Sequence, residues 1–189
     1  FPARDVLTDE DLRKTLGLLE GMDGSSDWTI TLEVTADGSD REASVDLVAR
    51  SDLVGVSLGL PPPFDKAPAE PWPFELNYPL AGSGRPLDIL ISDRAAIRLM
   101  LPAAQTAPSS VLINLDGRLA ALPPEGRVRI EGHVERLDGD GWVRAIIEEI
   151  GRGAGMAGLA LERSELVVNE LLFLDRLFAD VELVMDLQE

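Results

Sequence analysis

The sequence predicts a mainly β protein: an antiparallel, meandering, multi-stranded sheet accompanied by two short helices. Runs of alternating apolar and polar residues recur along most of the chain. Gly, Pro, Asn, Asp and Ser separate these runs, as turns require. The strand–helix–strand alternation of a parallel α/β fold is not visible. The same pattern also fits a closed β-sandwich, which stays open as the alternative fold.

The first predicted element is a helix at about residues 8–20. Thr8 can cap the free backbone N–H groups, and the acidic residues that follow suit the positive end of the helix dipole. Leu12, Leu16 and Leu19 form one apolar stripe, and Gly21 is placed to end the helix.

The sheet is predicted to occupy about residues 28–134, where the apolar period changes to two. The spacing of the runs indicates roughly eight to ten strands. One face of each strand is expected to be apolar. The strand positions expected to point inward are Ile30, Leu32, Val34, Val45, Leu47, Leu58, Leu76, Ile89, Ile91, Ile97, Leu99, Val111, Ile113, Val128 and Ile130.

The remainder of the chain is predicted to contain a helix at about 139–150, a Gly-rich loop at 151–158 and strands within 159–189. Asp138 or Asp140 can cap this helix, and Trp142 shares a face with two isoleucines further along it. The whole of 1–189 is expected to form one β-rich segment.

Three prolines, Pro61 to Pro63, interrupt the alternating pattern before it resumes at Trp72. A solvated polyproline ligand or a linker between domains would not carry the aromatic residues Phe64 and Trp72. We therefore expect 61–72 to be an ordered loop whose aromatic side chains cover the rim of the sheet.

Composition excludes several classes of function. The 189 residues include 34 acidic and 17 basic ones, giving a formal charge of −17, which repels nucleic-acid phosphates and anionic lipid headgroups. The sequence has no cysteine, so it has neither disulfides nor a thiolate site. Because the chain starts without methionine and stops within an apolar stretch, we expect it to be a piece of a longer protein whose membrane anchor lies outside it.

Two short motifs resemble ligand sites but lack the necessary context. Residues 153–158, GAGMAG, match G-x-G-x-x-G, yet a helix-like segment precedes them and a strand-like one follows, the reverse of a dinucleotide site. Asp138, Asp140 and Glu149 fall at calcium-loop spacing, but Trp142 and Val143 occupy positions that need an oxygen ligand and a glycine. A second stretch, DGSSDW, fails in the same way. The sequence therefore predicts no cofactor and no metal site.

Candidate catalytic residues are equally sparse. His133 is the only histidine and sits in a strand-like run, where a lone histidine is usually structural or exposed. There is no G-x-S-x-G nucleophile motif. An enzyme would need a carboxylate pair assembled by the fold, so we expect the chain not to be an enzyme.

The segment from Ser51 to Leu76, SDLVGVSLGLPPPFDKAPAEPWPFEL, resembles AsmA-like envelope proteins of Gram-negative bacteria, specifically the YhdP type. The matching positions are Asp52, Leu53, Gly55, Leu58, Leu60, Pro61, Pro63, Phe64 and Lys66. RIEGHVERLDGDGW is similar to a second element of that family, through Gly132, Leu137, Asp138, Asp140 and Trp142. ELVVNELLFLDRLFADVEL is similar to a third, but Asp175 and Arg176 stand where a Gly and a basic residue are usual.

The resemblance implies a curved, groove-like sheet in a periplasmic protein tethered to the inner membrane. Such a groove would carry phospholipid acyl chains toward the outer membrane, along the inward positions given above and bordered by the rim loop at Pro61, Phe64 and Trp72. The alternative function is an interaction scaffold with a closed core, which recruits other envelope proteins by strand addition at its edges.

Overall fold

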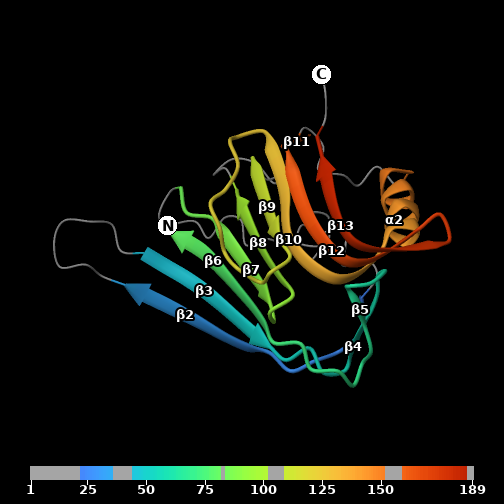
Figure 1. Cartoon of the computed structure of the whole chain (residues 1–189). Helices are drawn as coiled ribbons and strands as arrows, with labels where there is room; N and C mark the ends of the chain where they lie inside the picture. The colour runs from blue at the N-terminus through green and yellow to red at the C-terminus, as the bar shows by residue number, and fades with distance from the viewer. Residues whose placement is uncertain (1–21, 36–43, 82–83, 102–108, 152–158, 187–189) are drawn as a thin grey trace.

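The computed structural model describes residues 22–35, 44–81, 84–101, 109–151 and 159–186. Most of these residues belong to one large sheet of ten strands, with the order β13-β12-β10-β9-β8-β7-β6-β3-β2 and with β11 paired to β10 (Figure 1). The prediction of a mainly β, multi-stranded fold is confirmed. The strands of this sheet are β2 (Thr29–Thr35), β3 (Ser44–Ser51), β6 (Phe74–Ala81), β7 (Leu87–Ile91), β8 (Ala95–Met100), β9 (Ser110–Asn114), β10 (Arg127–Asp138), β11 (Ala160–Leu161), β12 (Ser164–Phe173) and β13 (Arg176–Met185).

Strand direction follows the predicted antiparallel meander from β2 to β9, except that β3 pairs with β6 rather than with β4. The later strands depart from it, because β10 runs parallel to both β9 and β12. Parallel neighbours need crossover connections. The first is segment 115–126, whose backbone carbonyls at Ala120 and Ala121 accept hydrogen bonds from Arg98 and Arg129. The second contains the helix.

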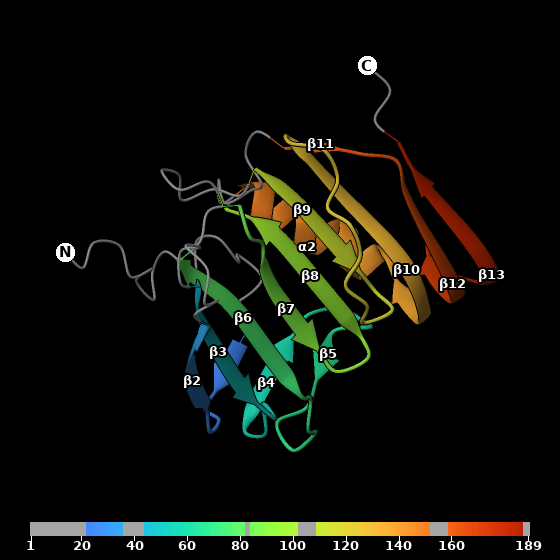
Figure 2. The ribbon, with the colours of Figure 1, turned by 90° about the vertical axis from the view of Figure 1, so that its left-hand side faces the viewer.

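The large sheet is open among the described residues: β2 forms one edge and β13 the other, and these two strands do not pair with each other. Figure 2 shows the strands as a single twisted layer with the two edges far apart. The alternative of a closed β-sandwich is therefore wrong for this part of the chain.

A small three-stranded sheet forms at one end of the large sheet. It consists of β1 (Met22–Gly24), β4 (Val56–Gly59) and β5 (Asp65–Lys66), in the order β1-β4-β5. Its core is Leu53, Val56 and Trp72, and it packs against Phe74 and Ile91 of the large sheet. The interval 61–72 is thus ordered, as expected, and it contributes a strand of its own.

A buried lysine holds this small sheet together. The Lys66 side chain is only 3% exposed, and its ammonium donates hydrogen bonds to the carbonyls of Leu53 (2.8 Å), Val56 (2.7 Å) and Ala67 (3.1 Å). An ammonium has three protons to donate, so these three bonds satisfy it completely.

The predicted helix at 139–150 is α2 (Gly139–Gly151). The Asp138 carboxylate accepts a hydrogen bond from the Gly141 N–H at 2.8 Å, which caps the first turn. The Trp142 indole donates to the Pro62 carbonyl at 2.9 Å and packs edge-on against Phe64. The helix predicted at 8–20 lies outside the described residues, as does the predicted Gly-rich loop after Gly151.

Strands β12 and β13 form a hairpin whose turn residues, Leu174 and Asp175, both have positive φ (53° and 56°). This left-handed conformation costs about 1–2 kcal/mol for a residue with a side chain, which explains why a glycine is usual in the resembling element. The Asp140 carboxylate of α2 accepts hydrogen bonds from the Leu174 and Asp175 N–H groups, at 3.1 and 3.2 Å. The turn therefore keeps its geometry without a glycine because the helix holds it.

Candidate functional site

The large sheet has one face that is apolar across its width, and we call this the inner face. Residues that are directly opposite in neighbouring strands carry their side chains on the same face. Strand pairing aligns one such residue from each of seven strands in a single row. The row is Ile30, Ala49, Leu76, Ile89, Ile97, Ile113 and Ile130.

Parallel rows widen this apolar face. Leu32 lies opposite Leu47, which lies opposite Tyr78. A further row follows in the centre of the sheet: Leu87, Leu99, Val111 and Val128. The register thus brings together the predicted inward positions of β2, β3 and β6 to β10. Leu58 is the exception, because β4 pairs only within the small sheet.

The inner face is exposed at one edge and packed in its centre. Ile30, Leu32 and Val34 of β2 are each more than 60% exposed. In the centre, Ile89 and Leu99 are buried in a cluster to which Leu101, Leu159 and Leu161 also pack. Contact with acyl chains is therefore directly possible at β2, whereas access to the centre requires these covering side chains to move.

The predicted rim residues take different positions. Phe64 packs against the core cluster of the inner face around Ala95 and Leu115, and it connects that cluster to α2 through Trp142. Pro61 is half-buried beside the start of α2. Trp72 is 1% exposed and belongs to the core of the small sheet, where Arg94 stacks on its ring with the guanidinium carbon 4.4 Å from the centroid. Segment 61–72 thus closes one end of the inner face.

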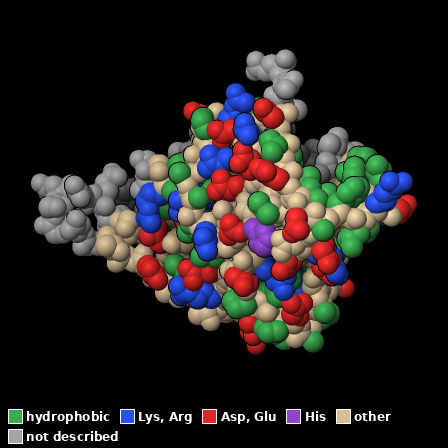
Figure 3. All heavy atoms as spheres, viewed as in Figure 1, with side chains coloured by type: hydrophobic (Ala, Val, Ile, Leu, Met, Phe, Trp, Pro, Cys, Tyr) green, Lys and Arg blue, Asp and Glu red, His purple; other side chains and the backbone are tan. Residues whose placement is uncertain are grey.

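The opposite, outer face carries the charged side chains, which cover the view in Figure 3. Arg98 donates two hydrogen bonds to Asp88, at 2.7 and 2.9 Å, and these bonds raise the pKa of Arg98 above its ordinary value against a smaller effect of burial. Arg50 pairs with Glu75 at 2.8 Å in the same way, and that hydrogen bond raises the pKa of Arg50. Arg98 and Arg50 on this face are thus each paired with a carboxylate.

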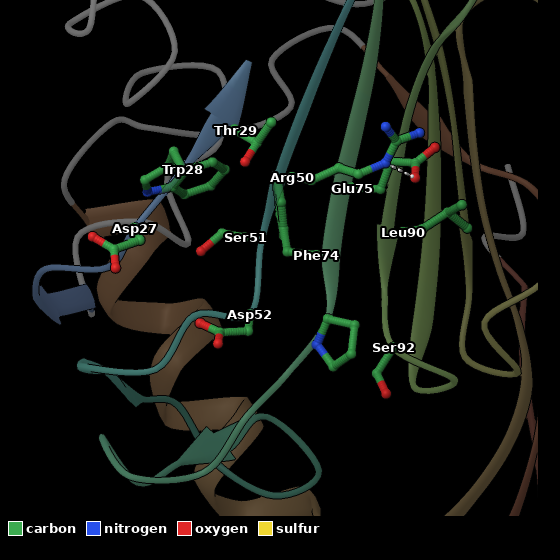
Figure 4. A pocket seen from close by; sticks show the side chains of 11 residues that line it. Asp27, Trp28, Thr29, Arg50, Ser51, Asp52, Phe74, Glu75, Leu90 and Ser92 are labelled. Carbon is green, nitrogen blue, oxygen red and sulfur yellow. Dashed lines mark hydrogen bonds and ion pairs between the residues drawn. The ribbon is translucent and has the colours of Figure 1, made fainter. Parts of the chain in front are cut away.

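A depression of about 580 Å³ lies where β2, β3 and β6 meet the small sheet (Figure 4). Trp28 and Phe74 line it with their rings 5.4 Å apart, and the Arg50–Glu75 pair borders it. Its remaining lining is Ser, Thr, Asp, Pro and Leu.

The acidic residues at calcium-loop spacing have structural roles instead. Asp138 caps α2, and Asp140 binds the hairpin turn. The side chain of Glu149 and the GAGMAG segment lie outside the described residues. Among the residues that are described, no cluster of His, Asp or Glu has the geometry to hold a metal ion.

His133 lies on the outer face, exposed to solvent. Its Nε2 is 2.8 Å from Asn169 Oδ1, and the Asn169 amide donates to Glu135. A neutral imidazole would have to be protonated at Nε2 to donate to this oxygen. These side-chain contacts connect β10 to β12 on the outer face, on the opposite side of the sheet from the apolar inner face.

Sequence reasoning missed two features. Lys66 enters the sequence analysis only through the resemblance, because its neighbours Asp65, Ala67 and Pro68 do not indicate that it is buried. The apolar end of the β12–β13 hairpin also escaped notice, since FLDRLF (residues 173–178) reads as two strand ends rather than as a surface.

No helix in the described ranges is long and apolar enough to span a bilayer. Neither curated proteins nor solved structures gave a match to this chain. A family model described as YhdP protein matches residues 5–189, which is nearly the whole chain. Because that match covers nearly the whole chain, the chain belongs to the YhdP family.

Proposed function

We propose that this chain is a non-enzymatic segment of a larger periplasmic protein, tethered to the inner membrane elsewhere. Its inner face would carry phospholipid acyl chains between the inner and outer membranes. The observation that supports this most is the seven-strand apolar row from Ile30 to Ile130. Membership of the YhdP family supports it as well.

The chemistry of the inner face suits acyl chains. Its rows consist of Ile, Leu, Val and Ala, with Tyr78 the one hydroxyl-bearing side chain among the positions of the three rows. Burying a methylene group is worth about 0.8 kcal/mol, so a chain of about 16 carbons gains on the order of 10 kcal/mol. The entropy lost when the lipid binds reduces this gain. Contact of this kind is unspecific, which lets a lipid move from strand to strand.

The test uses neighbouring residues of one strand. Leu32 points to the inner face and Thr31 to the outer face, and both are exposed, so aspartate at either position should leave the fold intact. The protein is purified without detergent and its bound lipid is measured by native mass spectrometry and extraction. We expect Leu32→Asp, alone and combined with Leu47→Asp, to lose most bound phospholipid, and Thr31→Asp to retain it.

Two results would count against lipid carriage. One is a wild-type protein that carries no phospholipid and takes up none when vesicles are added. The other is equal lipid content in Leu32→Asp and Thr31→Asp, because the inner face would then have no special role.

A second candidate function is recruitment of an envelope protein by strand addition at β2. Edge strands are normally protected by charged side chains, proline or a bulge. The sequence of β2 is TITLEVT: its one charged residue is Glu33, it has no proline or lysine, and every residue in it is exposed. A photo-crosslinking residue at Thr31 should capture a specific partner in cells if this edge is used. Thr31→Lys should abolish that partner's binding while lipid content stays unchanged.

A further inference from the structure

The free end of the β12–β13 hairpin exposes apolar side chains on both of its faces. Adjacent residues of a strand point in opposite directions, yet Leu177 and Phe178 are 65% and 44% exposed. Leu172, the cross-strand partner of Leu177, is 39% exposed and extends this surface, whereas Leu171, the partner of Phe178, is buried in the core. The exposed apolar residues of this end, which we call the hairpin tip, are Leu172, Phe173, Leu174, Leu177 and Phe178.

The helix α2 adds to this surface. It packs against β12, and Val143 and Ile147, one turn apart on the same side of the helix, are both exposed. Figure 3 shows hydrophobic side chains gathered where the hairpin and α2 lie, at the right of the view, in contrast to the charged strands beside them.

The tip is held rigidly in a conformation that presents an apolar side chain to solvent. Leu174 has a φ of 53° and its side chain is 70% exposed. Asn or Gly would adopt this backbone conformation more easily. The Asp140 carboxylate fixes the turn by accepting from two of its N–H groups. A leucine at such a position contributes nothing to the core, which points to a role outside the chain.

The geometry points to a zwitterionic lipid bilayer as the partner of this surface. We propose that the hairpin tip inserts into the headgroup region and the adjoining acyl chains of one leaflet, with α2 lying at the membrane surface. A protein groove usually covers one face of a hairpin, whereas hydrocarbon surrounds all of it, as a tip that exposes apolar side chains on both faces requires. The apolar residues of the tip are bounded by Glu170 and Asp180, four to five residues from the turn, and are interrupted at the apex by Asp175 and Arg176. Insertion is therefore shallow, roughly 10 Å at most.

Charge favours a zwitterionic surface over an anionic one. The chain carries a formal charge of −17, so anionic headgroups repel it. At the turn, Asp175 and Arg176 have opposite charges, so the apex carries no net charge. This inference does not rest on lipid carriage by the inner face, because the hairpin tip and the seven-strand row share no residue.

The absence of cysteine allows one label at a time to be attached. The protein is labelled with an environment-sensitive fluorophore at Leu174→Cys or, as the control, at Leu119→Cys, an exposed leucine of segment 115–126. Vesicles of phosphatidylcholine and phosphatidylethanolamine are then added. We expect a blue shift and a several-fold rise in emission at position 174 and no change at 119. Equal responses at the two positions, or none at 174, would overturn the proposal.

A second variant separates a structural role from insertion. Asparagine tolerates the left-handed conformation, so Leu174→Asn should fold at least as well as the wild type. We expect it nevertheless to lower flotation with zwitterionic vesicles several-fold, and Leu174→Asn combined with Leu177→Asn to abolish it. Unchanged flotation would refute insertion. So would concentration-dependent dimerisation that the same variants abolish, because the tip would then bind a second copy.

Discussion

Several residues that carry the family resemblance connect separate elements of the fold or fix their ends. Lys66 ties three carbonyls of the small sheet, Asp138 caps α2, and Asp140 holds the hairpin turn. Gly132 has a φ of 127°, and a Cβ there would lie 2.8 Å from the Leu115 backbone nitrogen. The motifs can be recognised in the sequence, but most of their roles depend on partners that are 10 to 35 residues away, and therefore on the fold.

Removing the Lys66 ammonium should destabilise the protein markedly. Lys66→Met keeps the aliphatic stem but leaves the Leu53 and Val56 carbonyls buried without their donor, which costs about 2–4 kcal/mol in the free energy of unfolding. Urea titration followed by tryptophan fluorescence measures this, since Trp72 lies in the same cluster. Arg163→Met, at an exposed ion pair, serves as the control and should change stability by less than about 1 kcal/mol. Equal midpoints for the two variants would contradict this account of Lys66.

At the scale of elements, periodicity predicted which side chains share a face but not which strands pair. Period-two alternation was enough to place Ile89, Ile97 and Ile113 on one face, because a half-buried strand admits only one register of its apolar side chains. Leu58 shows the limit: its run alternates like the others, yet β4 follows a turn at Gly55 (φ 94°) and joins a separate sheet. The parallel direction of β10 was also missed, since a strand's pattern does not depend on its neighbour's direction.

The contact between α2 and the hairpin provides an element-scale prediction. Asp140→Ala removes the acceptor of the Leu174 and Asp175 N–H groups, so the left-handed turn should open more often. We expect amide hydrogen exchange at these two residues to rise about tenfold, corresponding to roughly 1.4 kcal/mol of lost local stability. Amides in the middle of β12 provide the internal reference and should change little. Unchanged exchange at the turn would mean that the hairpin keeps its geometry without the helix.

At the scale of the whole molecule, the two faces of the large sheet differ in chemistry, although the outer face also carries the buried apolar residues Val48, Ala96 and Leu112. Charged pairs such as Arg98–Asp88 lie on the outer face and keep it hydrated. The apolar row on the inner face crosses seven strands. Its length is six interstrand spacings of about 4.8 Å each, roughly 29 Å in total. That distance approaches the full hydrocarbon thickness of a bilayer, about 30 Å, which two opposed acyl chains fill. One acyl chain of membrane length therefore fits along the row.

This geometry predicts how affinity depends on the lipid. Each added methylene finds further apolar surface along the row, so the dissociation constant of single-chain phospholipids should fall about two- to fourfold per methylene, the upper value corresponding to 0.8 kcal/mol. The fall should continue without a plateau from about 8 to 16 carbons, because the row is longer than the chain. The headgroup should matter little, since the row bears no charge. Titration calorimetry with lipids of different chain length, each with a choline or an ethanolamine headgroup, measures the effects of chain length and of headgroup on the dissociation constant. A plateau at short chains would instead mean that only the exposed β2 edge binds lipid, and that the packed centre around Ile89 and Leu99 stays closed.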